Sequence, residues 1–192
     1  MSASDGSAGD IIVAFAQFEA GSYSTTYIPT TTASATRIAD SFSRNNIYTN
    51  GLITSSGGTW FVELRNNIEY TKDSGDRGLF LDTSSTGNTN GFQFYHRGGL
   101  GNGRILITKR ISGSDSIIYA SLATTMKMII KWNGTSADVF ANGTKVVTAT
   151  SFTITAMEFL NFTTDGVPFF IQAMGLHPAP LTDAQCIELT TL

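Results

Sequence analysis

Hydrophobic and polar residues alternate most regularly between residues 126 and 150. Met128, Ile130 and Trp132 occupy every second position there, which is the period of a strand with one buried face. Asn-Gly pairs follow at 133–134 and 142–143, and both residue types tolerate the positive φ of tight turns. The stretch therefore predicts three successive antiparallel strands, a β-meander.

Similar patterns predict strands elsewhere in the chain. We expect them at residues 11–18, 59–65, 78–82, 92–97, 104–111, 116–122, 157–162 and 169–176, with a Gly-Gly turn at 57–58 and a hairpin joining 104–111 to 116–122. Near the C-terminus, Thr182 and Gln185 have the spacing of a capping box. The chain therefore predicts an all-β protein that ends in one short helix.

Composition adds bounds on size and partners. The chain has 192 residues, enough for one sandwich with a sizeable core. Charged residues make up 14%, below the roughly 25% of ordinary soluble domains. The net charge is -3 without a basic block, and no apolar run approaches the roughly 20 residues that span a bilayer. We expect neither nucleic-acid binding nor membrane insertion.

The single cysteine, Cys186, excludes an internal disulfide and a cysteine-based zinc site. Because it lies in an apolar pattern, we expect a buried structural thiol and not a nucleophile. We expect no signal peptide at the start of the chain. A protein with so few cysteines can still leave the cell by lysis or as part of a particle. The cysteine count therefore does not determine the cellular compartment.

Three stretches resemble concanavalin-A-like and laminin-G-like jelly rolls. Residues 129–147, IIKWNGTSADVFANGTKVV, resemble a "W…dGt…vyvNGk" pattern that spans two adjacent strands in those domains. Residues 58–64, GTWFVEL, resemble their opening strand, and PLTDAQCIEL near the end resembles their closing segment. The resemblance implies a two-sheet antiparallel jelly-roll sandwich with a short C-terminal helix.

A fourth stretch, residues 17–41, resembles a junction of bacteriophage tail and receptor-binding proteins, "QxEaGsxaTsYIPT…TRaaD". The matching residues are Gln17, Glu19, Gly21, Ser22, Thr25, Tyr27, Ile28, Pro29, Thr30, Thr36, Arg37 and Asp40. In those proteins the junction leads into a concanavalin-A-like domain. The resemblance implies a leading strand or linker at residues 1–32 and the jelly-roll domain at residues 33–192.

This resemblance implies a non-catalytic, lectin-like module of phage origin that recognises a host or polysaccharide glycan. Its place would be a virion surface or the extracellular space, as a homo-oligomer or as part of a larger parent protein. Two alternatives stay open, because a fold does not fix a function. One is a structural or oligomerising virion module, and the other is a degenerate polysaccharide lyase or glycoside hydrolase.

Catalytic motifs are incomplete in the sequence. The E-x-D-x-x-E pattern of jelly-roll glucanases, which supplies paired carboxylates, is absent. Glu63-Leu64-Arg65, together with Gln93 and His96, partly matches the R-x-E-x-R and Q-x-H strands of alginate-lyase-like jelly rolls. The first arginine is missing, however, and His96 follows Gln93 by three positions instead of two. We therefore expect no enzyme activity.

The strand at 92–97 carries our candidate glycan site. Sugar rings present an apolar C–H face and a rim of hydroxyls, so they favour an aromatic surface beside planar hydrogen-bonding side chains. Gln93, Tyr95 and Arg97 alternate along this strand and supply both. Glu63 and Arg65 would adjoin them if the two strands are neighbours in one sheet. The alternative is an ordinary solvated face.

A cofactor is not expected. The laminin-G resemblance would suit a structural calcium, which prefers clustered carboxylate and carbonyl oxygens. The isolated carboxylates Asp82, Asp115 and Asp165 are the candidates, but no D-x-D or N-x-D cluster accompanies them. The glycine-rich stretch 98–103 lacks the lysine of a phosphate-binding loop and predicts a hairpin loop instead.

Overall fold

The computed structural model describes residues 42–54, 56–64, 76–83, 90–97, 104–121, 123, 125–152, 156–163 and 171–192. All its strands and its helix belong to one compact unit, residues 39–192. The expected strand at 11–18, the phage-like junction and Asp165 lie outside the described residues. The domain boundary after residue 32 therefore stays a prediction.

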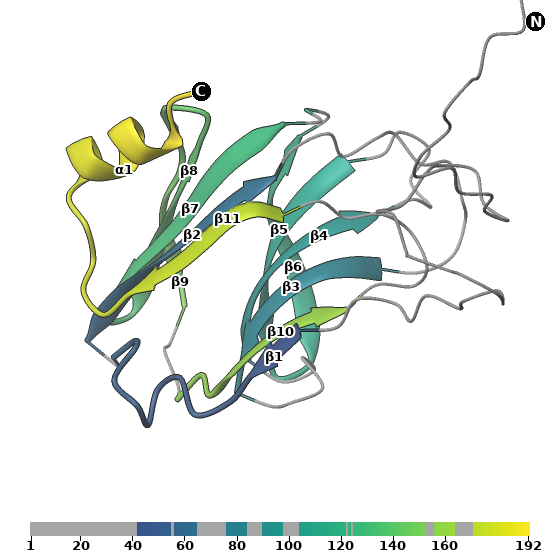
Figure 1. Ribbon diagram of the computed structural model, residues 1–192, viewed down its shortest axis with the longest axis vertical. Coiled ribbons are helices and arrows are strands. Elements are labelled where there is room, and N and C mark those ends of the chain that lie inside the picture. The colour runs from purple at the N-terminus through teal and green to yellow at the C-terminus, as the bar shows by residue number, and fades with distance from the viewer. Residues whose placement is uncertain are drawn as a thin grey trace, which may run out of the picture. The chain divides into compact units, whose positions relative to one another are not determined.

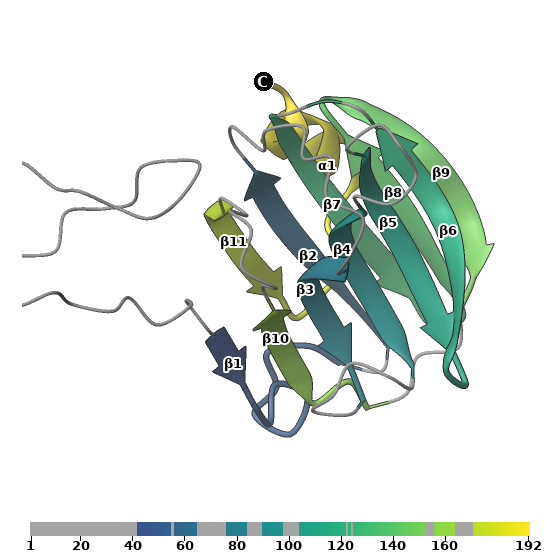
Figure 2. The same cartoon turned by 90° about the vertical axis from the view of Figure 1, so that its right-hand side faces the viewer.

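The described strands form two antiparallel sheets that lie face to face (Figures 1 and 2). The six-stranded sheet contains, in spatial order, β1 (Phe42–Arg44), β10 (Phe159–Thr163), β3 (Asp76–Asp82), β4 (Gly91–Arg97), β5 (Arg104–Ile111) and β6 (Ser114–Ser121). The five-stranded sheet contains β11 (Ile171–His177), β2 (Gly57–Leu64), β7 (Met126–Asn133), β8 (Ser136–Ala141) and β9 (Thr144–Ser151). This arrangement confirms the predicted jelly-roll sandwich, including the β5–β6 hairpin.

The predicted meander is confirmed as β7, β8 and β9, which pair in chain order. Its first turn has a φ of 59° at Gly134, the first of two loop residues, as a type II′ hairpin turn requires. Its second turn has positive φ at both Asn142 and Gly143, as in a type I′ turn. The side chain of Asn142 also accepts a hydrogen bond from the Lys127 N–H at 3.0 Å. Local turn chemistry therefore sets the pairing next to each turn, and the β8–β9 register shifts further along, between Ala137 and Phe140.

The hydrophobic core lies between the two sheets. Trp60, Val62 and Leu64 of β2 are fully buried and share the inner face, as their alternation predicts. The rings of Trp60 and Phe94 meet across the sandwich with centroids 4.5 Å apart. The other buried residues of this core include Leu79, Leu81, Phe92, Ile105, Ile107, Met126, Met128, Ile130, Trp132, Val139, Phe152 and Leu160.

The predicted Gly-Gly turn at 57–58 is wrong. Both glycines lie inside β2, where Gly57 pairs with Asn133 and Gly58 with Trp132. A Cβ atom on Gly58 would lie 2.2 Å from the Trp132 ring, and one on Gly57 would lie 2.7 Å from the Pro180 ring. These glycines therefore leave space for the rings of Trp132 and Pro180, which pack on the strand. The glycines are needed for contacts with residues far away in the sequence and not for a turn.

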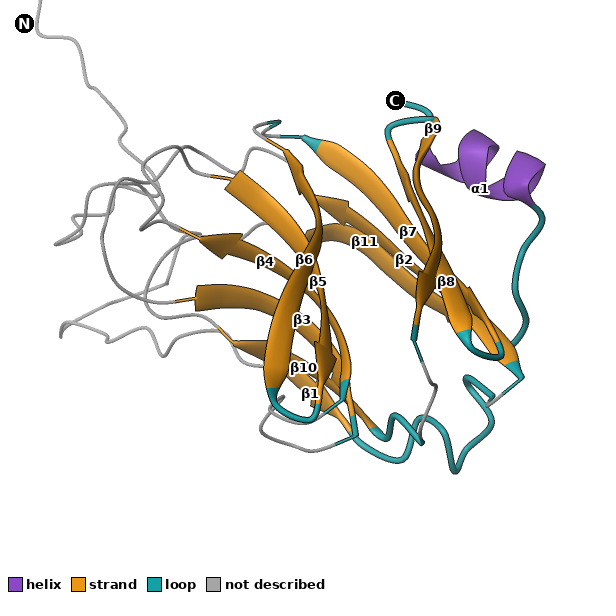
Figure 3. Cartoon of the chain, turned by 180° about the vertical axis from the view of Figure 1, so that it is seen from behind, coloured by secondary structure: helices purple, strands orange, loops and turns teal. Residues whose placement is uncertain are grey.

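The helix α1 (Asp183–Thr190) packs on the outer face of the five-stranded sheet, away from the other sheet (Figure 3). Its predicted capping box is confirmed, with Thr182 and Gln185 exchanging hydrogen bonds. On the side of α1 that faces the sheet, Cys186 is fully buried in a small cluster with Ile129 and Phe140. Burial raises the pKa of the Cys186 thiol, which favours its neutral form. Within the part of the chain described, no helix is long and apolar enough to cross a membrane.

Candidate functional site

The candidate strand of the glycan site is β4, in the middle of the six-stranded sheet. Phe92 and Phe94 point into the core, so Gln93 lies on the outer face. Gln93 is only 2% exposed, and its Oε1 accepts a hydrogen bond from Thr108 Oγ1 at 3.2 Å. It is therefore not an ordinary solvated surface residue.

For Tyr95 and Arg97, the other two candidate residues on β4, the structure describes the backbone only. Tyr95 pairs with Leu106 of β5, and Arg97 pairs with Arg104. Their side chains lie outside the described part of the structure. Their contact with a ligand therefore stays a prediction.

Glu63 does not adjoin these residues. It belongs to β2 of the five-stranded sheet, where it lies opposite Lys127 of β7. Because Trp60, Val62 and Leu64 face the core, Glu63 occupies the opposite outer face of the sandwich from Gln93. Glu63 and Arg65 were expected to join the site only if β2 and β4 were neighbours in one sheet, and these strands lie in different sheets. Arg65 itself lies outside the described residues.

A cross-strand row on the outer face of the six-stranded sheet contains Gln93 and two residues that the sequence analysis did not assign to the glycan site. Asn161 of β10 lies opposite Phe80 of β3, and Phe80 lies opposite Gln93. This order places an aromatic ring between two planar amides. Phe80 is half-buried, whereas Asn161 is 8% exposed. The alternation of Phe80 with the buried Leu79 and Leu81 could have placed Phe80 on this face from the sequence. The pairing of β3 with β10, which brings Asn161 beside Phe80, is non-local and could not be read from that pattern.

A second row on the same sheet contains the calcium candidates that the structure describes. Asp82, Gly91, Arg110 and Asp115 lie opposite one another in that order. Arg110 forms a two-pronged ion pair with Asp115, with Nε and Nη2 each 2.6 Å from a carboxylate oxygen. The described residues contain no group of three His, Cys, Asp or Glu side chains suited to a metal ion. They therefore give no support for a calcium site.

A charged network lies on the outer face of the five-stranded sheet, beside the start of α1. Asp138 Oδ2 is 2.8 Å from Lys145 Nζ and 3.6 Å from Lys131 Nζ. Both lysines also pair with Asp183 of α1. Their ammonium groups lie 5.3 and 5.6 Å from the centre of the buried Phe140 ring. This network joins the helix to the meander.

The network shifts the pKa of three of its members. Burial alone would raise the pKa of Asp138, but hydrogen bonds from Lys145 and the Ala149 N–H, with the charges of both lysines, lower it overall. Hydrogen bonds from Lys131 and Lys145 lower the pKa of Asp183. The hydrogen bond to Asp138 raises the pKa of Lys145. The folded state therefore favours all of these groups in their charged forms.

Stability should fall on acidification through this network. Because the folded-state pKa values of Asp138 and Asp183 lie below their ordinary value of about 3.9, their contribution is complete above that pH and is lost as pH falls through the folded values. Lys145 contributes below its ordinary value of about 10.4 and loses this contribution as pH rises through its folded value. Urea unfolding between about pH 2 and 7 should show a smaller acid loss for Asp138→Asn than for the wild type. An equal loss in both proteins would contradict this role.

Solved structures resemble the fold at low sequence identity. Domain 4 of AbnA, a GH43 extracellular arabinanase from Geobacillus stearothermophilus, solved with arabinotriose, matches 73% of this chain and 69% of its own, with a TM-score of 0.54 and 12% identity. The CBM40 domain of the Ruminococcus gnavus IT-sialidase, solved with α2,6 sialyllactose, matches 80% of this chain and 94% of its own, with a TM-score of 0.52 and 13% identity. These likenesses agree with the β-sandwich fold.

The sequence comparisons are negative. A scan against protein families gives no match, and a comparison with curated proteins gives none either.

Proposed function

We propose that this protein is a non-catalytic carbohydrate-binding module that recognises a glycan through the outer face of its six-stranded sheet. The observation that carries the proposal is the row of Asn161, Phe80 and Gln93, which places an aromatic side chain between two amides on neighbouring strands. The half-buried ring of Phe80 is the kind of aromatic surface on which the C–H face of a sugar ring packs. The likeness to domains solved with arabinotriose and sialyllactose supports the same class of ligand.

Within this site the residues have different roles. Gln93 is buried and bonded to Thr108, so we assign to it the positioning of its neighbours and not direct contact with the glycan. Phe80 keeps part of its surface accessible. Tyr95 and Arg97 follow Gln93 along β4, and we assign to them the stacking contact and the charged hydrogen bonds to the glycan.

Strand placement disfavours the lyase alternative. That alternative requires the Glu63 strand and the Gln93 strand to present their residues to one substrate. These strands, β2 and β4, belong to different sheets. The incomplete motif is therefore not assembled into one site by the described residues.

A phage origin is the finer part of the proposal. It rests on the junction-like residues 17–41, which resemble the segment that leads into a concanavalin-A-like domain in phage receptor-binding proteins. The module would then serve in adhesion to a host or to its polysaccharide, on a virion surface or in the extracellular space. It would work as a homo-oligomer or within a larger parent protein.

A glycan array of the purified chain tests the function, with Tyr95→Ala and Arg97→Ala tested alongside. We expect binding to one glycan class, and affinity at least about tenfold weaker in each variant, which corresponds to about 1.4 kcal/mol of lost contact. Arg44→Ala is the matched control, because Arg44 is exposed on β1 at the edge of the same sheet. It should bind like the wild type.

The other outcomes separate the alternatives. Binding that survives both β4 variants would refute the roles assigned to Tyr95 and Arg97 but keep the function. No binding to any glycan, together with a stable oligomer in solution, would favour the structural virion module. Release of shorter sugars from a polysaccharide panel would favour the enzyme.

A further inference from the structure

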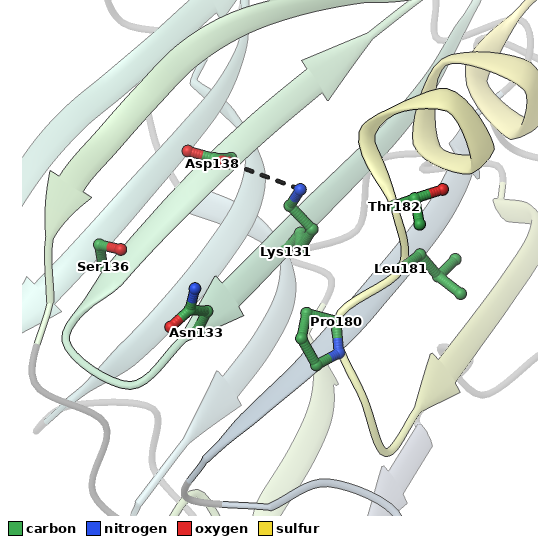
Figure 4. Close-up of a pocket in the computed structure, with 7 residues that line it drawn as sticks. All are labelled: Lys131, Asn133, Ser136, Asp138, Pro180, Leu181 and Thr182. Atoms are coloured by element: carbon green, nitrogen blue, oxygen red, sulfur yellow. Dashed lines mark ion pairs between the residues drawn. The ribbon is translucent and has the colours of Figure 1, made fainter.

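A pocket of about 240 Å³ lies on the other sheet, between the β7–β8 hairpin and the segment that leads into α1 (Figure 4). It is lined by Lys131, Asn133, Ser136, Asp138, Pro180, Leu181 and Thr182. This volume is below the roughly 300–1,000 Å³ of pockets for drug-sized ligands, so its size suits a single small ring.

The floor of the pocket is a polar patch on the hairpin. Asn133 lies opposite Ser136, and Lys131 lies opposite Asp138, so the four side chains share the outer face of the sheet. The tight turn at Gly134 holds the two strands in this register. The floor is therefore part of the best-specified local structure in the chain.

The wall of the pocket is formed by Pro180, Leu181 and Thr182, and hydrogen bonds hold this segment in place. Pro180 and Leu181 lie across from the hairpin (Figure 4). Thr59, which is buried in β2, donates a hydrogen bond to the Ala179 carbonyl at 3.1 Å and accepts one from the Leu181 N–H at 3.0 Å. The Pro180 ring packs over Gly57. These contacts hold the wall in place before any ligand binds.

Side chains on the floor of the pocket have polar groups that can still hydrogen-bond to a ligand. Within the described structure, the amide of Asn133 and the hydroxyl of Ser136 make no hydrogen bond, and Asn133 is exposed. The Asp138 carboxylate accepts from the Ala149 N–H at 2.7 Å and pairs with two lysines. A carboxylate has about four acceptor positions, so about one is left for a ligand hydroxyl.

The charges around the pocket are balanced. The ion pairs join Lys131 and Lys145 to Asp138 and Asp183, two positive groups to two negative ones. An ionic ligand would have to break one of these pairs to find a partner. A neutral ligand with hydroxyls on one side and an apolar C–H face on the other would meet the polar floor and the Pro180 wall without that cost.

We propose that this pocket binds a single neutral sugar residue, as a second carbohydrate site on the sheet opposite to the β4 site. Asn133, Ser136 and Asp138 would hold hydroxyl groups, and Pro180 would pack against the C–H face of the ring. Because β4 belongs to the other sheet, this site and the β4 site can be tested independently of each other.

Titration of the isotope-labelled chain, followed by its ¹H–¹⁵N spectrum, tests this proposal. The probes are the methyl glycosides of glucose, galactose, mannose and N-acetylglucosamine, up to about 50 mM, because a single sugar should bind with a Kd on the order of 1 mM. We expect at least one glycoside to shift the signals of the Asn133 side chain, Gly134 and Ser136. Inorganic phosphate, the charged comparison, should leave them unshifted.

Two variants and one control complete the test. Asn133→Ala and Ser136→Ala should each weaken the binding about three- to tenfold, as loss of one hydrogen bond predicts. Gln172→Ala, which removes an exposed amide from β11 of the same sheet, outside the pocket, should not change it. The proposal is overturned if no glycoside shifts these signals, if phosphate shifts them, or if both pocket variants bind like the wild type while their spectra remain those of a folded chain. Shifts confined to β4 would support the first site and refute this one.

Discussion

Trp60→Ala will lower the free energy of unfolding by about 3–5 kcal/mol, the usual cost of removing a large buried aromatic side chain. Trp60 is 0% exposed and meets Phe94 of the opposite sheet with ring centroids 4.5 Å apart. Its loss opens a cavity between the two sheets, which the β-sheet backbones on either side cannot close. Urea unfolding followed by far-ultraviolet circular dichroism measures the change.

Trp60→Phe is the matched control for this cavity. In the described structure, the indole N–H of Trp60 is buried without a hydrogen-bond partner. Phenylalanine removes that unpaired donor and keeps an aromatic ring beside Phe94, so its loss of stability should be clearly smaller than that of alanine. Equal losses in the two variants would mean that contact between the rings does not hold the sheets together.

Gly58→Ala will destabilise the fold by about 1–3 kcal/mol, the usual cost of forcing extra volume into a packed core. The added Cβ would lie 2.2 Å from Cζ2 of Trp132 and 2.7 Å from Cε2 of the same ring. Trp132 is itself fully buried and contacts Phe92 of the other sheet, so its ring has little room to move. The shift in the urea midpoint measures the effect.

Gly175→Ala on β11 is the control for Gly58→Ala, because it adds the same methyl group in the same sheet. A Cβ at Gly175 would meet nothing within 4 Å, and this glycine has no positive φ. The substitution should be neutral or should stabilise the protein by up to about 1 kcal/mol, because it restricts the unfolded chain. If both variants lost stability equally, crowding under Trp132 would not be the cause.

Local patterns predicted most of the fold. The period of two in β7 and the Asn-Gly turns after β7 and β8 act within a few residues, so the meander could be derived from the sequence. The same holds for the capping box at Thr182. Gly58 was misinterpreted because its role depends on Trp132, which is far away in the chain and adjacent only after the strands pair.

The candidate sites depend on strand order, and alternation cannot predict that order. It placed Gln93 correctly on the face opposite Phe92 and Phe94. It could not place Glu63 in the other sheet, nor bring Asn161 beside Phe80, because these relations depend on which strands become neighbours. The pocket at Pro180 was missed for the same reason, since its wall and floor come from separate segments.

The strand order also has a consequence for the synthesis of the chain. β10 lies between β1 and β3, and β11 is the edge strand that pairs with β2. Each sheet therefore contains a strand that follows all the other described strands of that sheet in chain order. A chain truncated before residue 159 would leave β1 without its partner and would expose the backbone edges of β2 and β3, which can pair with other chains. A chain that ends before β10 should therefore aggregate and not form a smaller folded domain.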